Sequence, residues 1–238
     1  VDQWIRGAIG CAVYATKIGM IQNMERDEVI ALSFGALLHD IGMLQLPSSI
    51  LYKTGSLSRD ELEIMKTHTT LGYKLLKDEP GLPLLSAHCA LLHHERLCGS
   101  GYPFGMRGAD IHPIVRWVGI IDAYVAMTSP RRHRKPLLPH EAMEVLYAGA
   151  DILYDLEKVE LFRNKVVAFP PGISVALSTG ETGVVSRINP HNKHRPVVRV
   201  IRSQTGEELD KPYELDLSAC LNVMIDRVGE IDLVASFA

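Results

Sequence analysis

The first two-thirds of the chain repeat apolar residues at three- and four-residue spacing, with breaks at glycine and proline, and this pattern predicts a helical bundle. Ser58 and Glu61 have the spacing of a capping box and should open a helix that carries Ile64, Met65 and His68 on successive turns. The other expected helices cover Asp2 to Met20, Asp27 to His39, Leu82 to Glu95 and a long segment from Pro113.

Near Val167 the apolar pattern changes to alternation, and glycine and proline become more frequent. Alternating runs bounded by turn residues predict short strands. We expect strands over Ile173 to Leu177, Gly183 to Ile188, Val197 to Ile201 and Tyr213 to Leu217. The predicted fold is therefore mainly α, with a helical domain over residues 1–166 and a small all-β, barrel-like domain of unknown role over residues 167–238.

Composition narrows the possible partners of the chain. Its 238 residues are 47% hydrophobic and carry a formal net charge of −3, which argues against binding polymeric nucleic acid or an anionic membrane by charge alone. No apolar run reaches the roughly 18 residues of a membrane span. The four cysteines (Cys11, Cys89, Cys98 and Cys220) form no metal-type or disulfide-type spacing. We therefore expect a cytoplasmic protein with reduced thiols.

A group of histidines and aspartates carries the candidate chemistry. An adjacent His-Asp pair stands in LLHDIG, two further histidines stand in HHERLCGSGYP, and single residues of the same kind lie on two other helices. Imidazole nitrogens and carboxylate oxygens are ligands of transition metals, and one carboxylate can bridge two ions. The six candidates are His39, Asp40, His68, His93, His94 and Asp122.

These six residues predict a centre for two divalent cations. Asp40 would bridge the two ions, with His68, His93 and His94 on one and His39 and Asp122 on the other. Two such ions carry more positive charge than two aspartates balance, so the centre would attract phosphate. Metal ions also make a bound water acidic enough to supply hydroxide. We therefore expect phosphodiester hydrolysis, with His39 and Asp40 at the reacting centre.

The order of these motifs resembles the HD-GYP family of bacterial cyclic di-GMP phosphodiesterases, over roughly Ala8 to Phe162. The resemblance implies an HD-type helical bundle, two divalent transition metal ions, iron or manganese, and hydrolysis of cyclic di-GMP to pGpG and on to GMP in bacterial signal transduction. It also implies substrate-binding roles for Gly99, Gly101, Tyr102, Arg131 and Arg134. An ordinary turn for the glycines and a solvated loop for the arginines are the alternatives. Glu95 either orients a histidine or is a solvated helix end.

The chain departs from the family pattern at several positions near the centre. Met43 stands where the family has a lysine, so a cation beside the scissile phosphate is missing. Gln3 and Gly7 replace a glutamate and a histidine of the first helix, and Val125 replaces an acidic residue. A third metal is therefore not expected, and the ion at His39 and Asp122 loses one protein ligand.

Two functions remain open from the sequence. One is a phosphodiesterase with reduced activity, and the other is a degenerate relative that binds metal or cyclic dinucleotide as a sensor or scaffold and signals through a protein partner. The chain begins with Val1 in helical pattern, so we expect an upstream sensor domain in a longer protein. Apolar positions on the first helix are compatible with a homodimer.

Overall fold

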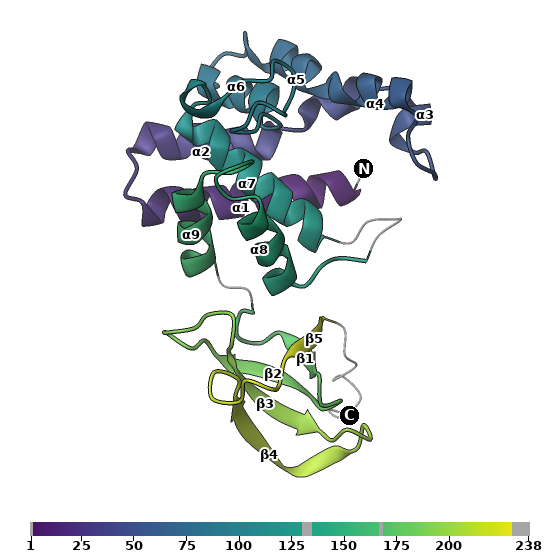
Figure 1. Cartoon of the computed structure of the whole chain (residues 1–238), viewed down its shortest axis with the longest axis vertical. Coiled ribbons are helices and arrows are strands. Elements are labelled where there is room, and N and C mark those ends of the chain that lie inside the picture. The colour runs from purple at the N-terminus through teal and green to yellow at the C-terminus, as the bar shows by residue number, and fades with distance from the viewer. Residues whose placement is uncertain (1, 130–134, 167–168, 230–238) are drawn as a thin grey trace. The chain divides into compact units, whose positions relative to one another are not determined.

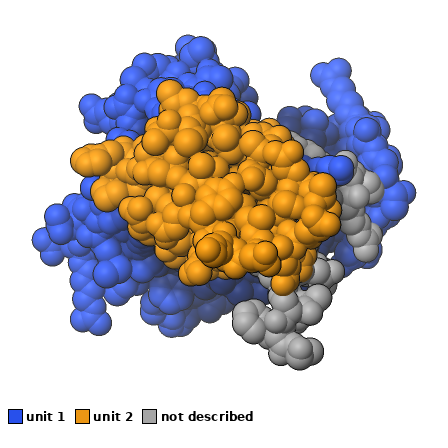
Figure 2. All heavy atoms as spheres, turned by 90° about the horizontal axis from the view of Figure 1, so that it is seen from below, with its two compact units in different colours: residues 1–137, 142–165 blue, residues 138–141, 166–238 orange. Residues whose placement is uncertain are grey.

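The computed structural model describes residues 2–129, 135–166 and 169–229. The chain divides into two compact units, which Figure 2 colours separately. The first contains residues 1–137 and 142–165, and the second contains residues 138–141 and 166–238. The first unit is helical and the second is built on one sheet, as the sequence predicts.

The helical unit follows the predicted order of elements (Figure 1). Its helices are α1 Asp2–Ile21, α2 Arg26–Leu38, α3 Ser48–Leu51, α4 Arg59–Lys66, α5 His68–Leu76, α6 Leu84–Leu92, α7 Pro113–Thr128, α8 Pro139–Ala148 and α9 Leu156–Lys165. Two short 3₁₀ segments, η1 Ile41–Gln45 and η2 Gly108–Asp110, lie between them. Pro139 and the residues up to Glu141 belong to the second compact unit.

Helix α7 forms the centre of the helical core. Nine of its residues are buried, and it packs against α1, α2 and α6. Tyr124 of α7 contacts Tyr14 of α1 and Phe162 of α9 edge to face, with ring centroids 5.6 and 5.1 Å away. Burying a large apolar side chain stabilises a fold by about 1.5–3 kcal/mol, so this aromatic cluster holds three helices that are distant in sequence.

The helix predicted to run from Ser58 through His68 is interrupted, which corrects the prediction. The capping box at Ser58 and Glu61 is present, but α4 ends at Lys66 and α5 begins at His68. The hydroxyl of Thr67 donates to the Ile64 carbonyl at 2.6 Å, and the Thr67 N–H bonds to the same carbonyl. Threonine hydroxyls compete for helix carbonyls and bend the chain. The break reorients His68 relative to α4.

Two glycines let the segment after α2 approach α5. A Cβ at Gly42 would collide with the His68 carbonyl, and one at Gly72 would lie 3.3 Å from the Gly42 nitrogen. Only residues without a side chain allow such a backbone-to-backbone approach. The glycine of LLHDIG therefore holds η1, and with it the His-Asp pair, beside the first residue of α5.

The second unit is an antiparallel five-stranded sheet in the order β4-β3-β2-β1-β5. The strands are β1 Ser174–Leu177, β2 Thr182–Arg187, β3 Val197–Arg202, β4 Glu208–Asp216 and β5 Ile225–Val228. Within the described residues the edge strands β4 and β5 do not pair, so the sheet is open and the barrel-like closure expected from sequence is wrong. Strand β5 was not predicted, because its sequence IDRV is too short for the alternation of apolar and polar residues to be recognised.

The sheet covers an apolar cluster of its own. Its buried members are Phe169, Val175, Leu177, Val185, Val198, Val200, Leu217, Val223 and Ile225. The guanidinium of Arg195 donates to the carbonyls of Leu217, Cys220, Leu221 and Val223 at 2.8 to 3.3 Å. This arginine therefore fastens the segment between β4 and β5 to the start of β3.

None of the helices in the described ranges combines the length and apolar character that a membrane span requires. On α1, Ile5, Ile9 and Val13 are exposed at successive turns. This stripe is the basis for the expected homodimer, which stays a prediction.

Candidate metal centre

The predicted ligands come from the ends of helices. His39 is the residue that follows α2, and Asp40 leads into η1. His68 begins α5, and His93 and His94 follow α6. At a helix end the chain can turn two adjacent side chains toward one point, which the 100° rotation between neighbours inside a helix does not allow. Asp122 lies within α7.

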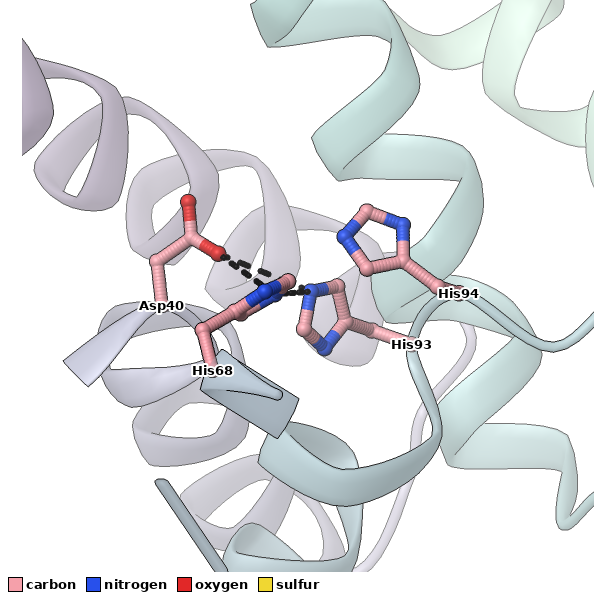
Figure 3. Close-up of side chains that lie close together, drawn as sticks. All are labelled: Asp40, His68, His93 and His94. Atoms are coloured by element: carbon pink, nitrogen blue, oxygen red, sulfur yellow. Dashed lines mark hydrogen bonds and ion pairs between the residues drawn. The ribbon is translucent and has the colours of Figure 1, made fainter. Parts of the chain in front are cut away.

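Four of these residues converge on one point (Figure 3). Candidate ligand atoms of Asp40, His68, His93 and His94 all lie within 4.8 Å of one another. The Asp40 Oδ1 atom is 3.4 Å from His68 Nε2 and 3.6 Å from His93 Nε2. His68 and His93 are 1% exposed, whereas Asp40 and His94 are partly exposed, so the group has a buried side and a side open to solvent.

Backbone carbonyls fix which nitrogen each buried histidine presents. His68 Nδ1 donates to the Met65 carbonyl at 2.7 Å, and His93 Nδ1 donates to the Cys89 carbonyl at 3.1 Å. A carbonyl only accepts, so in the neutral rings each Nε2 carries a lone pair. These two Nε2 atoms face each other at 3.4 Å. Two facing lone pairs repel unless a cation lies between them, and metal-bound histidines commonly have this carbonyl arrangement.

Asp40 supplies the second test of whether a cation fits. Its Oδ1 atom is buried and has no hydrogen-bond partner among the described residues. An unpaired buried carboxylate oxygen is costly, and a divalent cation would satisfy it. Burial alone would raise the pKa of Asp40, but the neighbouring histidines, His39 first, hold it well below its usual range. The donor set therefore suits a transition metal.

A second group of possible ligands adjoins the first. His39 Nδ1 donates to the Ala36 carbonyl at 2.8 Å, so its Nε2 faces the centre. That Nε2 lies 3.3 Å from Asp122 Oδ1 and 3.5 Å from Asp40 Oδ2. The third member is Cys11 of α1, and the candidate ligand atoms of Cys11, His39 and Asp122 lie within 4.8 Å of one another. Asp40 thus turns one oxygen toward each group.

The pKa values of the ionisable side chains in the two groups follow from this charge distribution. Burial alone would lower the pKa of His39, but the carboxylates of Asp40 and Asp122 raise it to about 9. Burial would raise the pKa of Asp122, but His39 lowers it to about 2. Burial and the neighbouring His93 lower the pKa of His94 and of His68, so both rings are neutral donors at pH 7.

The loop that carries GYP folds over the two adjacent histidines. The Tyr102 N–H bonds to the His94 carbonyl at 3.3 Å, and the Tyr102 ring stacks on the His94 ring with centroids 4.6 Å apart. A Cβ at Gly101 would meet the backbone of residues 94–96. Glu95 is 5% exposed, and its carboxylate accepts the N–H groups of Phe104 and Met106 at 2.7 and 2.9 Å. Glu95 therefore holds this loop, and within the described ranges it makes no hydrogen bond to a histidine.

The structure describes three of the five predicted substrate-binding residues. Tyr102 borders the histidine cluster, and burial raises the pKa of its hydroxyl. Gly99 has φ of 81°, and a Cβ there would meet the Arg107 side chain, so local geometry accounts for this glycine and for Gly101. Arg131 and Arg134 lie outside the described residues. The ligand-binding roles of all five residues stay predictions.

Two residues near the centre were not singled out from sequence as part of it. Cys11 was interpreted as an ordinary thiol because its spacing matches no metal motif. Its position one helical turn after Gly7 was the available signal. Lys66 lies with its Nζ 5.6 Å from the Tyr102 ring centroid and pairs with Glu63 at 2.6 Å. Its closeness in sequence to His68 was the only indication.

The residues that depart from the family pattern lie in different environments in the structure. Gly7 has no side chain to add to the centre, and a Cβ there would meet no atom within 4 Å. Met43 lies in η1, half-buried. Val125 is 6% exposed and lies next to Gly10 of α1, so it is part of the core. The Gln3 side chain lies outside the described structure.

Known protein families and relatives match both parts of this chain. A family model described as "HD domain" matches residues 6–157, and one described as "KOW domain associated with HD domain" matches residues 174–236. A Thermotoga maritima protein named cyclic di-GMP phosphodiesterase is 38% identical over 160 residues, which are 67% of this chain and 41% of the relative. The Pseudomonas aeruginosa cyclic di-GMP phosphodiesterase PA4108 is 30% identical over 228 residues, covering 95% of this chain and 53% of the relative.

Among solved structures, the Bdellovibrio bacteriovorus protein Bd1817, described as an HDG"Y"P protein, superimposes with a TM-score of 0.56 and 19% identity. The match covers 67% of this chain and 51% of that protein, and at this identity it shows the fold alone. The chain spans about half or less of the length of the two relatives above. The matched HD domain model covers more than half of the chain and contains all six predicted ligands. This chain therefore belongs to the HD domain family and, by its motifs and relatives, to the HD-GYP group within it.

Proposed function

We propose that this chain is a metal-dependent phosphodiesterase that hydrolyses cyclic di-GMP to pGpG and on to GMP. The observation that carries the proposal is the convergence of Asp40 and three histidine rings, with a buried Asp40 oxygen that has no hydrogen-bond partner in the part of the chain that the structure describes. The names of the similar proteins supply the substrate class.

The metal-binding roles divide between the two groups of ligands. Asp40, His68, His93 and His94 would hold one divalent ion, and His39 and Asp122 would help to hold a second, with iron and manganese as the expected metals. Bound there, such ions would polarise phosphoryl oxygens and make a bound water more acidic.

Side chains around the metal ligands would bind the substrate and its phosphates. The Tyr102 hydroxyl remains protonated at neutral pH and can donate a hydrogen bond to the substrate, while its ring holds His94 in place. Arg131 and Arg134 would bind phosphate, since a guanidinium makes paired hydrogen bonds with it. Met43 offers no positive charge to the transition state, so we expect slow turnover.

The test combines metal analysis with product detection. Protein reconstituted with iron or manganese should bind metal and convert cyclic di-GMP to pGpG and GMP in a chromatographic assay. His68→Gln should lose metal and turnover. The matched control is His88→Gln, because His88 stacks on Tyr73 outside the ligand groups and should be dispensable for both. Turnover that survives in His68→Gln would contradict the assignment.

A second possible function, that of a sensor, is favoured by Met43 and Gly7. The family pattern has a lysine and a histidine at these two positions, so this chain lacks one cation and one possible ligand side chain. In that case the chain would bind metal and cyclic dinucleotide as a sensor. Full metal occupancy with cyclic di-GMP binding, measured by calorimetry, but without turnover would reject the enzyme in favour of the sensor.

A further inference from the structure

We propose that the Cys11 thiolate is the ligand that α1 contributes to the second metal position, so that a sulfur atom completes the group formed by His39 and Asp122. This inference rests on the proposed function only in treating the centre as a metal centre. It assigns a role to a residue that the motif pattern does not include.

The geometry around Cys11 carries the assignment. Its Sγ lies within 4.8 Å of candidate ligand atoms of both His39 and Asp122, which come from the end of α2 and from α7. Cys11 is 1% exposed. Three donors of different chemical type, from α1, the end of α2 and α7, therefore lie close together, and two of them are buried. His39 presents a nitrogen whose orientation the Ala36 carbonyl fixes.

The position of Cys11 on α1 explains why sulfur would serve here. The family pattern expects a histidine at the position of Gly7, and Gly7 has no side chain to contribute. Cys11 lies one turn further along, and residues four apart share a helix face. Its neighbours on that face, Ala15 and Ile18, are fully buried. The ligand lost at one turn would thus be replaced from the next turn.

Cys89 shows what a merely buried thiol looks like in this fold. It is also fully buried, and burial alone raises its pKa to about 12. A Cβ at Gly35 would lie 2.6 Å from its Sγ, so Cys89 fills the contact between α2 and α6. The Cys11 Sγ, in contrast, lies within 4.8 Å of candidate ligand atoms of His39 and Asp122. Cys89 belongs to neither ligand group.

A sulfur ligand changes which metal the second position prefers. Thiolates favour Zn²⁺, Co²⁺ and Fe²⁺ over Mn²⁺, whereas nitrogen and oxygen donors alone accept manganese readily. Cys11 and Asp122 together would balance the charge of one divalent ion. We therefore expect the second position of this chain to bind iron, cobalt or zinc more tightly than manganese.

Cobalt substitution tests the assignment without relying on activity. The wild-type protein loaded with Co²⁺ should bind two ions per chain and show a near-ultraviolet sulfur-to-cobalt charge-transfer band. Cys11→Ser should lose that band and bind the second cobalt at least about tenfold more weakly, since even indirect changes around a metal cost that much. The matched control Cys89→Ser should keep the band and both ions.

A second measurement covers the case in which Cys11→Ser does not fold. X-ray absorption of the zinc-loaded wild-type protein should show a zinc–sulfur distance of about 2.3 Å. Two bound ions without a sulfur signal, or a cobalt band that survives in folded Cys11→Ser, would overturn the role of Cys11 alone. A chain that binds no metal would overturn this inference and the proposed function together. A sulfur signal without cyclic di-GMP hydrolysis would sink only the proposed function.

Discussion

The GYP loop depends on one buried carboxylate, and Glu95→Gln tests this dependence with almost no change of shape. Both Glu95 oxygens accept backbone N–H groups, from Phe104 at 2.7 Å and from Met106 at 2.9 Å. A glutamine has one accepting oxygen and one donating amide group. One of the two N–H groups would therefore face another donor inside the protein.

The expected cost follows from these contacts. A hydrogen bond to a charged group contributes about 1.5–3 kcal/mol, and a buried donor left without a partner costs about 1–3 kcal/mol. Since Glu95 is 5% exposed, water cannot easily replace the lost bond. We expect Glu95→Gln to lower the free energy of unfolding of the helical unit by about 2–4 kcal/mol.

Urea unfolding followed by tryptophan fluorescence measures this quantity in the helical unit, because both tryptophans, Trp4 and Trp117, lie there. Amide hydrogen exchange at Phe104 and Met106 should become faster in Glu95→Gln. The matched control is Glu61→Gln, since Glu61 accepts an N–H group in an exposed capping box and should cost about 1 kcal/mol or less. A loss below about 0.5 kcal/mol with both amides still protected would refute the reasoning.

Three further changes follow from the same structure. Gly42→Ala should lower the free energy of unfolding by about 3 kcal/mol or more and weaken metal binding, because its Cβ would collide with the His68 carbonyl. Urea unfolding measures the loss, and the control is Gly55→Ala, where a Cβ meets nothing within 4 Å. Asp155→Asn should lower the free energy of unfolding by about 1 kcal/mol at pH 7. Burial alone would raise the pKa of the Asp155 carboxyl, but its ion pairs with Lys158 and Arg116 lower it. A lowered folded-state pKa stabilises above the unfolded value of about 3.9, so urea unfolding at several pH values should show the difference shrinking as the pH falls below that value and disappearing below the lowered folded-state pKa. Met43→Lys should raise kcat with cyclic di-GMP by about tenfold or more in a product assay, and an unchanged kcat would show that the missing lysine does not limit turnover.

Much of the fold was predictable because local signals dominate it. The capping box at Ser58 and Glu61 is present, and the glycines of Thr179-Gly180 and Thr205-Gly206 have φ values of 91° and 87°, as turns between strands require. The helix break at Thr67 was missed because its cause is a hydroxyl that competes for a backbone carbonyl. Sheet closure was predicted wrongly, since alternation reveals strands but does not show how edge strands pair.

For the centre, the sequence by itself determined which residues have metal-binding chemistry and that His39, His93 and His94 stand where helices end. Those are properties of residue type and short-range spacing, which the chain carries locally. Only the tertiary structure decided that α1 turns Cys11 toward His39 and Asp122, and that Glu95 holds the GYP loop by its backbone. Both facts depend on how closely distant segments of the chain pack. Gly42 and Gly72 have no side chains and so allow η1 to approach α5, and the buried helix α7 sets the positions of the helices packed against it. Such distances arise when the whole core packs at once, and no spacing along the chain encodes them.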